Sequence, residues 1–264
     1  MRPGGDTPDD AVPPAADLRS PRPGVETITW KGRLGPMGLG VSSRTFRPTT
    51  ITHVLAQAME VRRGDVVIDV GCGSGILGII AAKLGASRVY GTDVSPDVVD
   101  VASGNAARHG VAHCTTFFQG DLFSALPSDV RADLIVGDVS GVPDELAADS
   151  GWFPSRTGGG RRGCELPIRM IREAGRRLAP AGRMLLPTAT LQDEPPILDA
   201  ARAAFASDVK VAQRAIPLPS AIAEADSLKR LAQEGVIHLG TRGSRLIWDA
   251  RVWRCDAAPG SGTA

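Results

Sequence analysis

The stretch at residues 66–75, Val-Val-Ile-Asp-Val-Gly-Cys-Gly-Ser-Gly, constrains the fold more than any other part of the chain. Its apolar, β-branched beginning is typical of a buried strand, and Gly71, Gly73 and Gly75 lead from it into a helical pattern. Glycine adopts backbone angles that other residues avoid and lets a ligand approach the backbone closely. The free N–H groups at a helix N-terminus favour an anionic group. The stretch therefore predicts a strand, a ligand-binding loop and a helix.

Beyond residue 64 the chain alternates short apolar runs with amphipathic stretches. We expect strands at 66–70, 88–92, 116–118, 132–136 and 182–186, with helices at 76–84, 95–109 and 166–178. Towards the C-terminus we expect helices at 197–205 and 220–233 and strands at 209–216, 236–239 and 245–254. This order predicts an α/β fold with a doubly wound, mostly parallel seven-stranded sheet and a C-terminal antiparallel strand pair.

The two ends of the chain differ from the rest in composition. Residues 1–24 hold six prolines and almost no large apolar side chain, so we expect a disordered leader there, and a disordered tail at 256–264. Between them we expect a hairpin and helix at 25–63 that cover the binding site, followed by a cofactor-binding domain at 64–255. The roles of the leader and of the insertion at 217–235 stay open.

Charge and cysteine content narrow the classes of function. The formal net charge is +1, which is not typical of a dedicated nucleic-acid-binding protein. The four cysteines and four histidines show no metal-ligand spacing, and scattered thiols suit a reducing compartment. No apolar run approaches the roughly 20 residues that span a bilayer. We expect a cytoplasmic protein without a metal and without membrane or nucleic-acid partners.

Two acidic residues accompany the glycine loop. Asp69 lies in the strand before the loop, and Asp93 ends the next strand, about where an acid reaches ribose hydroxyls in nucleotide-binding folds. Two carboxylates repel a pyrophosphate and attract a cation. The loop therefore favours S-adenosyl-L-methionine (SAM), with S-adenosyl-L-homocysteine as product, over a dinucleotide.

Four short segments carry a resemblance to a known family. Residues 68–75 resemble the first motif of class I SAM-dependent methyltransferases, 91–95 the second, 119–123 the third, and 178–183 the turn before the fifth strand. The match covers roughly residues 48–190. It implies a cofactor site, with Asp121 at the adenine amino group and Leu122 beside the ring. The full predicted set is Asp69, Gly71, Cys72, Gly73, Gly75, Asp93, Val94, Asp121, Leu122 and Asp138.

Within this class the spacing is most similar to the release-factor glutamine and ribosomal-protein methyltransferases, at residues 46–49, 120–126 and 157–163. Those enzymes carry Asn-Pro-Pro-Tyr after the fourth strand, where the Asn holds the acceptor nitrogen and the Tyr stacks on the target. This chain has Asp138-Val139-Ser140-Gly141 there. A carboxylate accepts hydrogen bonds and takes a proton, whereas an amide also donates. We therefore predict that Asp138 is catalytic and accepts or orients the nucleophile's proton.

The lost Asn-Pro-Pro-Tyr segment and the near-zero net charge lead to a prediction about the acceptor. We expect methyl transfer to a nitrogen or carbon of a small-molecule acceptor of specialised, natural-product metabolism. The predicted acceptor pocket consists of Trp30, Phe46, Ser140, Trp152 and Phe153. The alternative is N-methylation of a protein side chain, either a glutamine amide or an amine. Two further alternatives are an NAD-dependent dehydrogenase, which the glycine spacing disfavours, and a non-catalytic SAM-binding module. The oligomeric state is left open.

Overall fold

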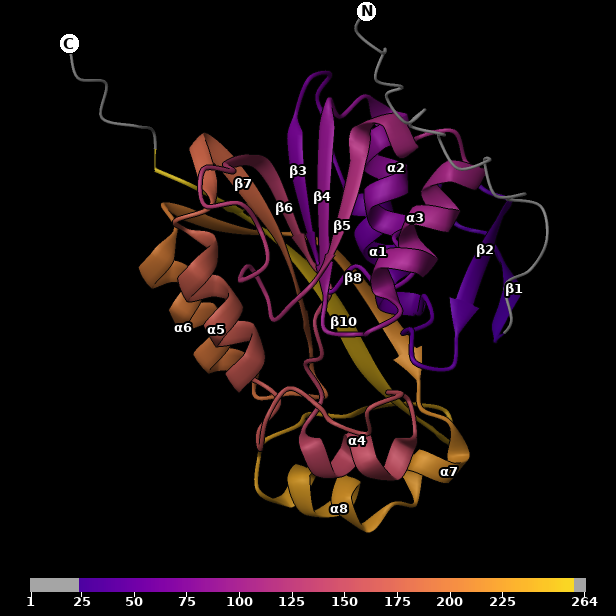
Figure 1. Ribbon diagram of the computed structural model, residues 1–264. Helices are drawn as coiled ribbons and strands as arrows, with labels where there is room; N and C mark the ends of the chain where they lie inside the picture. Colours follow the sequence, from indigo (N-terminus) through magenta and orange to yellow (C-terminus); the bar gives the residue numbers. More distant parts are fainter. Residues whose placement is uncertain (1–23, 259–264) are drawn as a thin grey trace, which may run out of the picture.

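A computed structural model describes residues 24–258 (Figure 1). The predicted leader, apart from Gly24, and residues 259–264 of the predicted tail lie outside the described residues. A central sheet lies between two layers of helices. Its strands run in the order β5 (Thr115–Gln119), β4 (Arg88–Asp93), β3 (Val66–Val70), β6 (Ala132–Gly137), β7 (Leu178–Ala189), β10 (Arg245–Asp256) and β8 (Ser207–Pro217), and β9 (Gly240–Arg242) pairs with β10.

The strand directions match the predicted topology. Strands β3 to β7 pair in parallel, and β10 pairs antiparallel with both β7 and β8. The predicted mostly parallel sheet with a C-terminal antiparallel pair is therefore confirmed. From β3 the chain builds outward to β4 and β5 on one side and to β6 and β7 on the other. The point where this order reverses lies between β3 and β6, and such a switch point is where doubly wound sheets bind ligands.

Successive side chains of a strand point to opposite faces of the sheet, so they pack into two apolar clusters. Val67 and Leu134 pack in the cluster under α1 (Thr50–Ala58), α2 (Ile76–Leu84) and α3 (Val98–Arg108). Their neighbours Ile68 and Ile135 pack in the cluster under α5 (Glu165–Ala174) and α6 (Glu194–Ala204). Figure 1 shows the two helix layers on opposite faces of the sheet. Strands buried on both faces explain the near-continuous apolar runs of the sequence.

A separate hairpin of β1 (Val25–Trp30) and β2 (Met37–Ser42) packs against α3. Buried Asn105 of α3 accepts a hydrogen bond from Gly40 N and donates to the carbonyl oxygens of Gly40 and Ser74. One buried amide thereby ties the hairpin to the glycine loop, with three of its hydrogen-bonding positions used.

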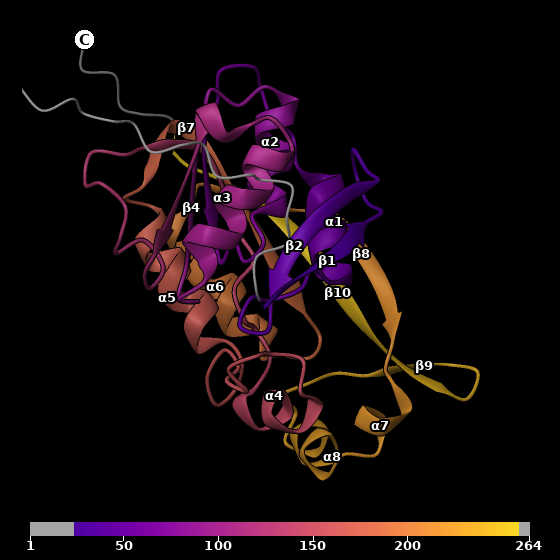
Figure 2. The same cartoon turned by 45° about the vertical axis from the view of Figure 1, so that its right-hand side comes forward.

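A third apolar cluster lies beyond one end of the sheet, where α4 (Asp144–Ser150), α7 (Ser220–Ala223) and α8 (Asp226–Gln233) group together (Figures 1 and 2). The predicted single helix at 220–233 is thus two helices. The predicted strand at 236–239 is wrong, because Val236 and Ile237 pack into this cluster and Val236 N donates to Leu231 O behind α8. A short apolar run alone does not separate a strand from a helix end.

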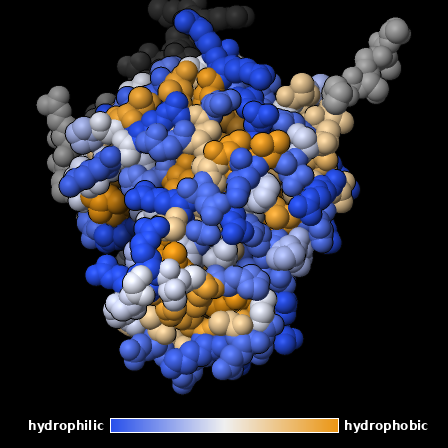
Figure 3. All heavy atoms as spheres, turned by 180° about the vertical axis from the view of Figure 1, so that it is seen from behind, coloured by the Kyte–Doolittle hydropathy of each residue, from blue (hydrophilic) through white to orange (hydrophobic). Residues whose placement is uncertain are grey.

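One face of the molecule carries both apolar and hydrophilic side chains. Seen from behind, apolar side chains are broken up by hydrophilic ones (Figure 3). None of the helices in the described part of the chain has the length and apolar character needed to cross a bilayer. Within that same part, no three His, Cys, Asp or Glu side chains come together in a geometry that would hold a metal ion.

Candidate active site

A cavity of about 740 Å³ opens at the switch point of the sheet. Its walls come from the carboxyl ends of β3, β4 and β6, from the segment before α1, and from the loops around α4 and after β7. This volume lies within the usual range for cofactor and small-ligand sites. The lining is mainly apolar, with the carboxylates of Asp93, Asp121 and Asp138 as the acidic groups among the described lining residues.

The glycine loop begins at the cavity wall and turns away from it. Gly71, Gly73 and Gly75 have φ values of +74°, +49° and +78°, in the region that favours glycine. A Cβ on Gly71 would lie 2.6 Å from Asp138 O, and one on Gly73 would lie 3.1 Å from Phe46 O. Of the three, Gly71 lines the cavity. These glycines are therefore required where the loop packs against its own chain, whereas the sequence had suggested contact with a ligand.

Replacing Gly71 with Ala tests this tight packing. We expect the free energy of unfolding to fall by about 1–2 kcal/mol from the left-handed backbone alone, and further because the new methyl group pushes against Asp138 O. Chemical denaturation measures the change. Gly104→Ala in α3 is the matched control, since no atom lies within 4 Å of its added Cβ and alanine favours a helix. Equal stability of the two variants would contradict the packing argument.

Asp69 lies beneath the loop and does not line the cavity. The residue is fully buried, and its Oδ2 accepts a hydrogen bond of 2.8 Å from Gly78 N in α2. Its Oδ1 has no partner among residues 24–258. Burial raises the pKa of Asp69 to about 7. Asp69, which the sequence placed among the cofactor-binding residues, therefore has a buried structural position, because strand alternation turns this side chain towards α2.

Asp93 does line the cavity at the end of β4. Its Oδ2 accepts a hydrogen bond from Gly73 N at 3.0 Å and its Oδ1 accepts one from Ser95 N at 2.8 Å. The carboxylate therefore holds the glycine loop and the following turn in place while facing the cavity.

The other predicted cofactor residues divide into two groups. Val94, Asp121 and Leu122 line the cavity, with Val94 65% exposed and Leu122 at a positive φ of +47°. Asp121 pairs with Arg169 at 2.7 Å. Cys72, Gly73 and Gly75 do not line it. Burial also raises the pKa of the Cys72 thiol well above its usual range, which keeps that thiol protonated.

Asp138 follows β6 and joins two parts of the site. Its N–H donates to Val70 O at 2.9 Å, and its Oδ2 accepts a hydrogen bond of 2.9 Å from Thr52 Oγ1 on α1. Desolvation raises the pKa of Asp138 to about 6, with Thr52 opposing the rise and Asp93 adding to it. At neutral pH Asp138 is mainly ionised, and its pKa is close enough to 7 for the carboxylate to take up and release a proton.

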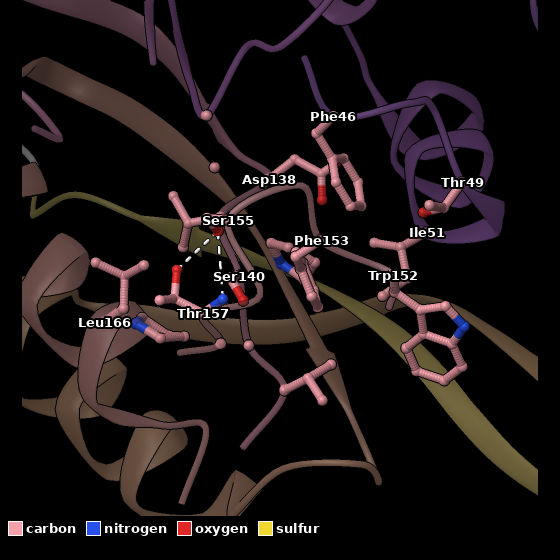
Figure 4. A pocket seen from close by; sticks show the side chains of 18 of the residues that line it. Phe46, Thr49, Ile51, Asp138, Ser140, Trp152, Phe153, Ser155, Thr157 and Leu166 are labelled. Atoms are coloured by element: carbon pink, nitrogen blue, oxygen red, sulfur yellow. Dashed lines mark hydrogen bonds between the residues drawn. The ribbon is translucent and has the colours of Figure 1, made fainter. Parts of the chain in front are cut away.

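The predicted acceptor residues come together with one exception. Phe46 and Phe153 stack with ring centroids 5.2 Å apart and planes 16° apart. Trp152 and Ser140 also line the cavity, and Figure 4 shows these side chains around Asp138. Trp30 does not reach the cavity: it is 2% exposed, and its ring stacks on His53 at 4.0 Å. Its strand belongs to the hairpin, whose inner face packs into the cluster under α1.

Several lining residues carry no sequence signal that would identify them. Gln192 follows β7, Trp248 lies in β10, and Pro219 precedes α7. They are separated from the glycine loop by more than a hundred residues. Strand β7 brings Gln192 to the cavity, and the antiparallel pair of β10 and β8 brings Trp248 and Pro219.

Known proteins are similar in sequence to the part of the chain that forms the glycine-loop side of the cavity. Residues 46–142 match the family model described as "Ribosomal protein L11 methyltransferase (PrmA)". A ribosomal protein L11 methyltransferase of Pelotomaculum thermopropionicum is 40% identical over 111 residues, which cover 42% of this chain and 34% of that protein. One of Edwardsiella ictaluri is 42% identical over 122 residues, covering 46% and 40%. The aligned region spans well under half the length of these curated relatives.

Solved structures share the fold at low sequence identity. A 16S rRNA methyltransferase of T. thermophilus, in complex with AdoMet and guanosine, matches with a TM-score of 0.58 and 14% identity, covering 88% of this chain and 50% of that one. The YcgJ protein of Bacillus matches with a TM-score of 0.53 and 18% identity, covering 79% and 99%.

These comparisons correct one prediction. The relatives are named for methylation of a ribosomal protein, so the prediction of a small-molecule acceptor in natural-product metabolism is wrong. That prediction gave too much weight to the missing Asn-Pro-Pro-Tyr segment. The sheet topology and the similarity of residues 46–142 both point to methyltransferases. The chain has the Rossmann-like methyltransferase fold, and residues 46–142 are similar to the ribosomal protein L11 methyltransferases.

Proposed function

We propose that this chain transfers a methyl group from SAM to a nitrogen of a protein side chain or chain end. One observation carries the proposal: Asp138, facing the switch-point cavity, lies within the segment that is similar to ribosomal protein L11 methyltransferases. That segment also contributes Phe46, Asp93 and Asp121 to the cavity wall. The cofactor side of the cavity thus comes from the part of the chain that resembles protein methyltransferases.

The residues present fit SAM in size and charge. A cavity of about 740 Å³ is large enough for a nucleoside with an amino-acid arm. Asp93 lines the cavity, and its carboxylate can accept hydrogen bonds from ribose hydroxyls. The carboxylates of Asp93 and Asp138 favour a cationic ligand. Asp121 and Leu122 also line the cavity, and the resemblance of residues 119–123 to the third methyltransferase motif assigns them to the adenine.

The protein's contribution to catalysis is positioning, exclusion of water and proton handling. When bound, SAM supplies a methyl group on a cationic sulfur, whose C–S electron pair stays on sulfur as the acceptor nitrogen's lone pair forms the new bond. Asp138 accepts a hydrogen bond from that nitrogen and takes the proton that the nitrogen loses. The stacked rings of Phe46 and Phe153 form an apolar wall beside it.

Two measurements test the proposal. Titration calorimetry with SAM, S-adenosyl-L-homocysteine and NAD is expected to show binding of the first two. Replacing Asp93 with Asn is expected to weaken SAM binding by about tenfold or more, because a charge-assisted hydrogen bond is lost. Binding of NAD alone would contradict the proposal.

Transfer of tritiated methyl groups tests the acceptor. The substrates are ribosomal subunits from a bacterium that lacks its own ribosomal protein L11 methyltransferase, and protein and small-molecule fractions of a cell extract. We expect label in protein. Label confined to the small-molecule fraction would refute a protein acceptor, and SAM binding without any transfer would indicate a non-catalytic module.

A further inference from the structure

The loop of residues 152–157, between α4 and α5, forms part of the cavity wall and has few hydrogen bonds. Five of its six residues line the cavity, and residues 154–157 are exposed to solvent. Among the described residues, three of its backbone N–H groups are hydrogen-bonded, each to a residue at most three positions away: Trp152 N to Ser150 Oγ, Arg156 N to Phe153 O and Thr157 N to Ser155 Oγ. No hydrogen bond within 24–258 joins the loop to the opposite wall of the cavity.

Both ends of the 152–157 loop are fixed to α4. Gly151 N donates to Ala147 O near the end of that helix, and Gly158 N donates to Asp144 Oδ1 at its beginning at 2.8 Å. Gly151 has a φ of +64°, in the region that favours glycine. The loop can therefore move between two fixed ends while α4 and α5 stay in place.

One aromatic contact joins the loop to the opposite wall. Phe153 of the loop stacks on Phe46, which lies in the segment before α1, with ring centroids 5.2 Å apart and planes 16° apart. Both side chains line the cavity (Figure 4). The stack thus connects the wall beside α4 with the wall beside the glycine loop.

The wall that carries Phe46 is firmly held. Arg44 Nε donates to Asp97 Oδ2 at 3.0 Å, and Ser42 Oγ donates to the same oxygen at 2.7 Å. The backbone of Phe46 packs against the glycine loop, where a Cβ on Gly73 would lie 3.1 Å from Phe46 O. The stack therefore joins a fixed wall to a loop that is held at its ends alone.

We propose that residues 152–157 form a lid over the cavity, which opens when Phe153 leaves Phe46. The inference rests on SAM binding in this cavity, which is part of the proposed function. Opening breaks one ring contact and no hydrogen bond to the opposite wall. Closing covers the bound cofactor and excludes water, which is the general role of such loops in enzymes. Ligand entry and product release both require the open loop, so the stack controls both rates.

A lid differs from an ordinary binding contact in its effect on rate constants. Loss of a closing contact that is present in both the free and the bound protein raises the association and dissociation rate constants together, and their ratio stays the same. Loss of a contact to the ligand acts mainly on dissociation and weakens affinity by the same factor. Measuring both rate constants therefore separates the two roles.

Phe153→Leu keeps an apolar side chain and removes the ring. We expect both rate constants for S-adenosyl-L-homocysteine, measured by stopped-flow fluorescence, to rise by about 2- to 10-fold, the range that loss of an aromatic pair allows. The dissociation constant should change by no more than about twofold. Phe46→Leu should have the same effect, and the double variant no greater one, because each breaks the same stack. Unchanged rate constants, or faster dissociation without faster association, would overturn the lid.

Phe118→Leu is the matched control. Phe118 stacks on Tyr90 with ring centroids 6.5 Å apart, and neither residue lines the cavity. Loss of this ring should leave both rate constants as in the wild type. A change as large as that in Phe153→Leu would show general loosening of the protein and would refute the lid.

Cleavage by trypsin after Arg156 tests the loop without a cofactor. Arg156 is exposed and lies within the loop, and a protease cuts a segment that opens locally. We expect cleavage of this bond, followed by mass spectrometry, to be about 2- to 10-fold faster in Phe153→Leu than in the wild type, because cleavage follows the open population. Equal cleavage rates would contradict the lid. A wild type that binds no S-adenosyl-L-homocysteine would contradict the proposed function, while the cleavage rates still decide whether the stack holds the loop closed.

Discussion

Replacing Asp138 with Asn is expected to lower the turnover of methyl transfer by about 10²- to 10⁴-fold. The Asn side chain has nearly the same shape and still accepts a hydrogen bond from Thr52 Oγ1, which lies 2.9 Å from the carboxylate in the wild type. It cannot take the proton that the acceptor nitrogen loses. Turnover under saturating SAM and acceptor measures the effect, and calorimetry with SAM checks that the cofactor site is intact. Unchanged turnover would remove Asp138 from the catalytic residues.

The pH dependence of the wild type gives a second measure of the same group. The pKa of Asp138 lies at about 6, and the ionised form is the proton acceptor, so kcat/KM should fall as the pH drops below that value and level off above it. Thr52→Val removes a hydrogen bond that lowers this pKa, so the acidic limb should move to higher pH. Thr52→Ser retains the hydroxyl and serves as its control. An acidic limb that stays in place in Thr52→Val would contradict the assignment.

Asp69 is expected to make the stability of the protein depend on pH in an unusual direction. Burial raises the pKa of Asp69 to about 7 in the folded protein, from a value near 3.8 in the unfolded chain. The folded state therefore holds its proton more tightly than the unfolded state does. The folded form is favoured below the unfolded pKa, and that advantage is lost as the pH rises from about 4 to about 7.

Asp69→Asn isolates this contribution. The variant retains an oxygen for Gly78 N but has no charge to bury. The unfolding free energy of the wild type, relative to the variant, should fall by about 4 kcal/mol between pH 4 and pH 8. Chemical denaturation of both proteins across this range measures the difference. Asp129→Asn is the control, because Asp129 is exposed and its removal takes away no buried charge. The unfolding free energy of this variant should change with pH as that of the wild type does. A difference that does not change with pH would contradict the buried, proton-binding state of Asp69.

Many residues on the cofactor side of the cavity can be predicted from the local sequence. Asp93, Asp121 and Asp138 each come at or just after the end of a predicted parallel strand, and parallel strands bring their carboxyl ends to one edge of the sheet. All three do line the cavity. Their grouping was predictable because strand periodicity and strand direction are encoded by neighbouring residues.

The face on which a side chain lies was less predictable. Asp69 and Trp30 both sit in strands near the site, yet Asp69 turns beneath the loop to Gly78 and Trp30 stacks on His53 in the core. Alternation says that neighbouring side chains point to opposite faces. Which face a helix then covers depends on how the layers pack.

The glycine loop and its strand, with the alternating pattern that follows them, were enough to predict the doubly wound sheet and to favour SAM as the cofactor. Only the tertiary structure decided the other walls of the cavity, where Gln192 after β7 and Trp248 of β10 line the same cavity as Asp138 and Ser140. Contacts between residues so far apart in the chain depend on strand order and on the packing of loops across the sheet. No local pattern of side chains carries that information.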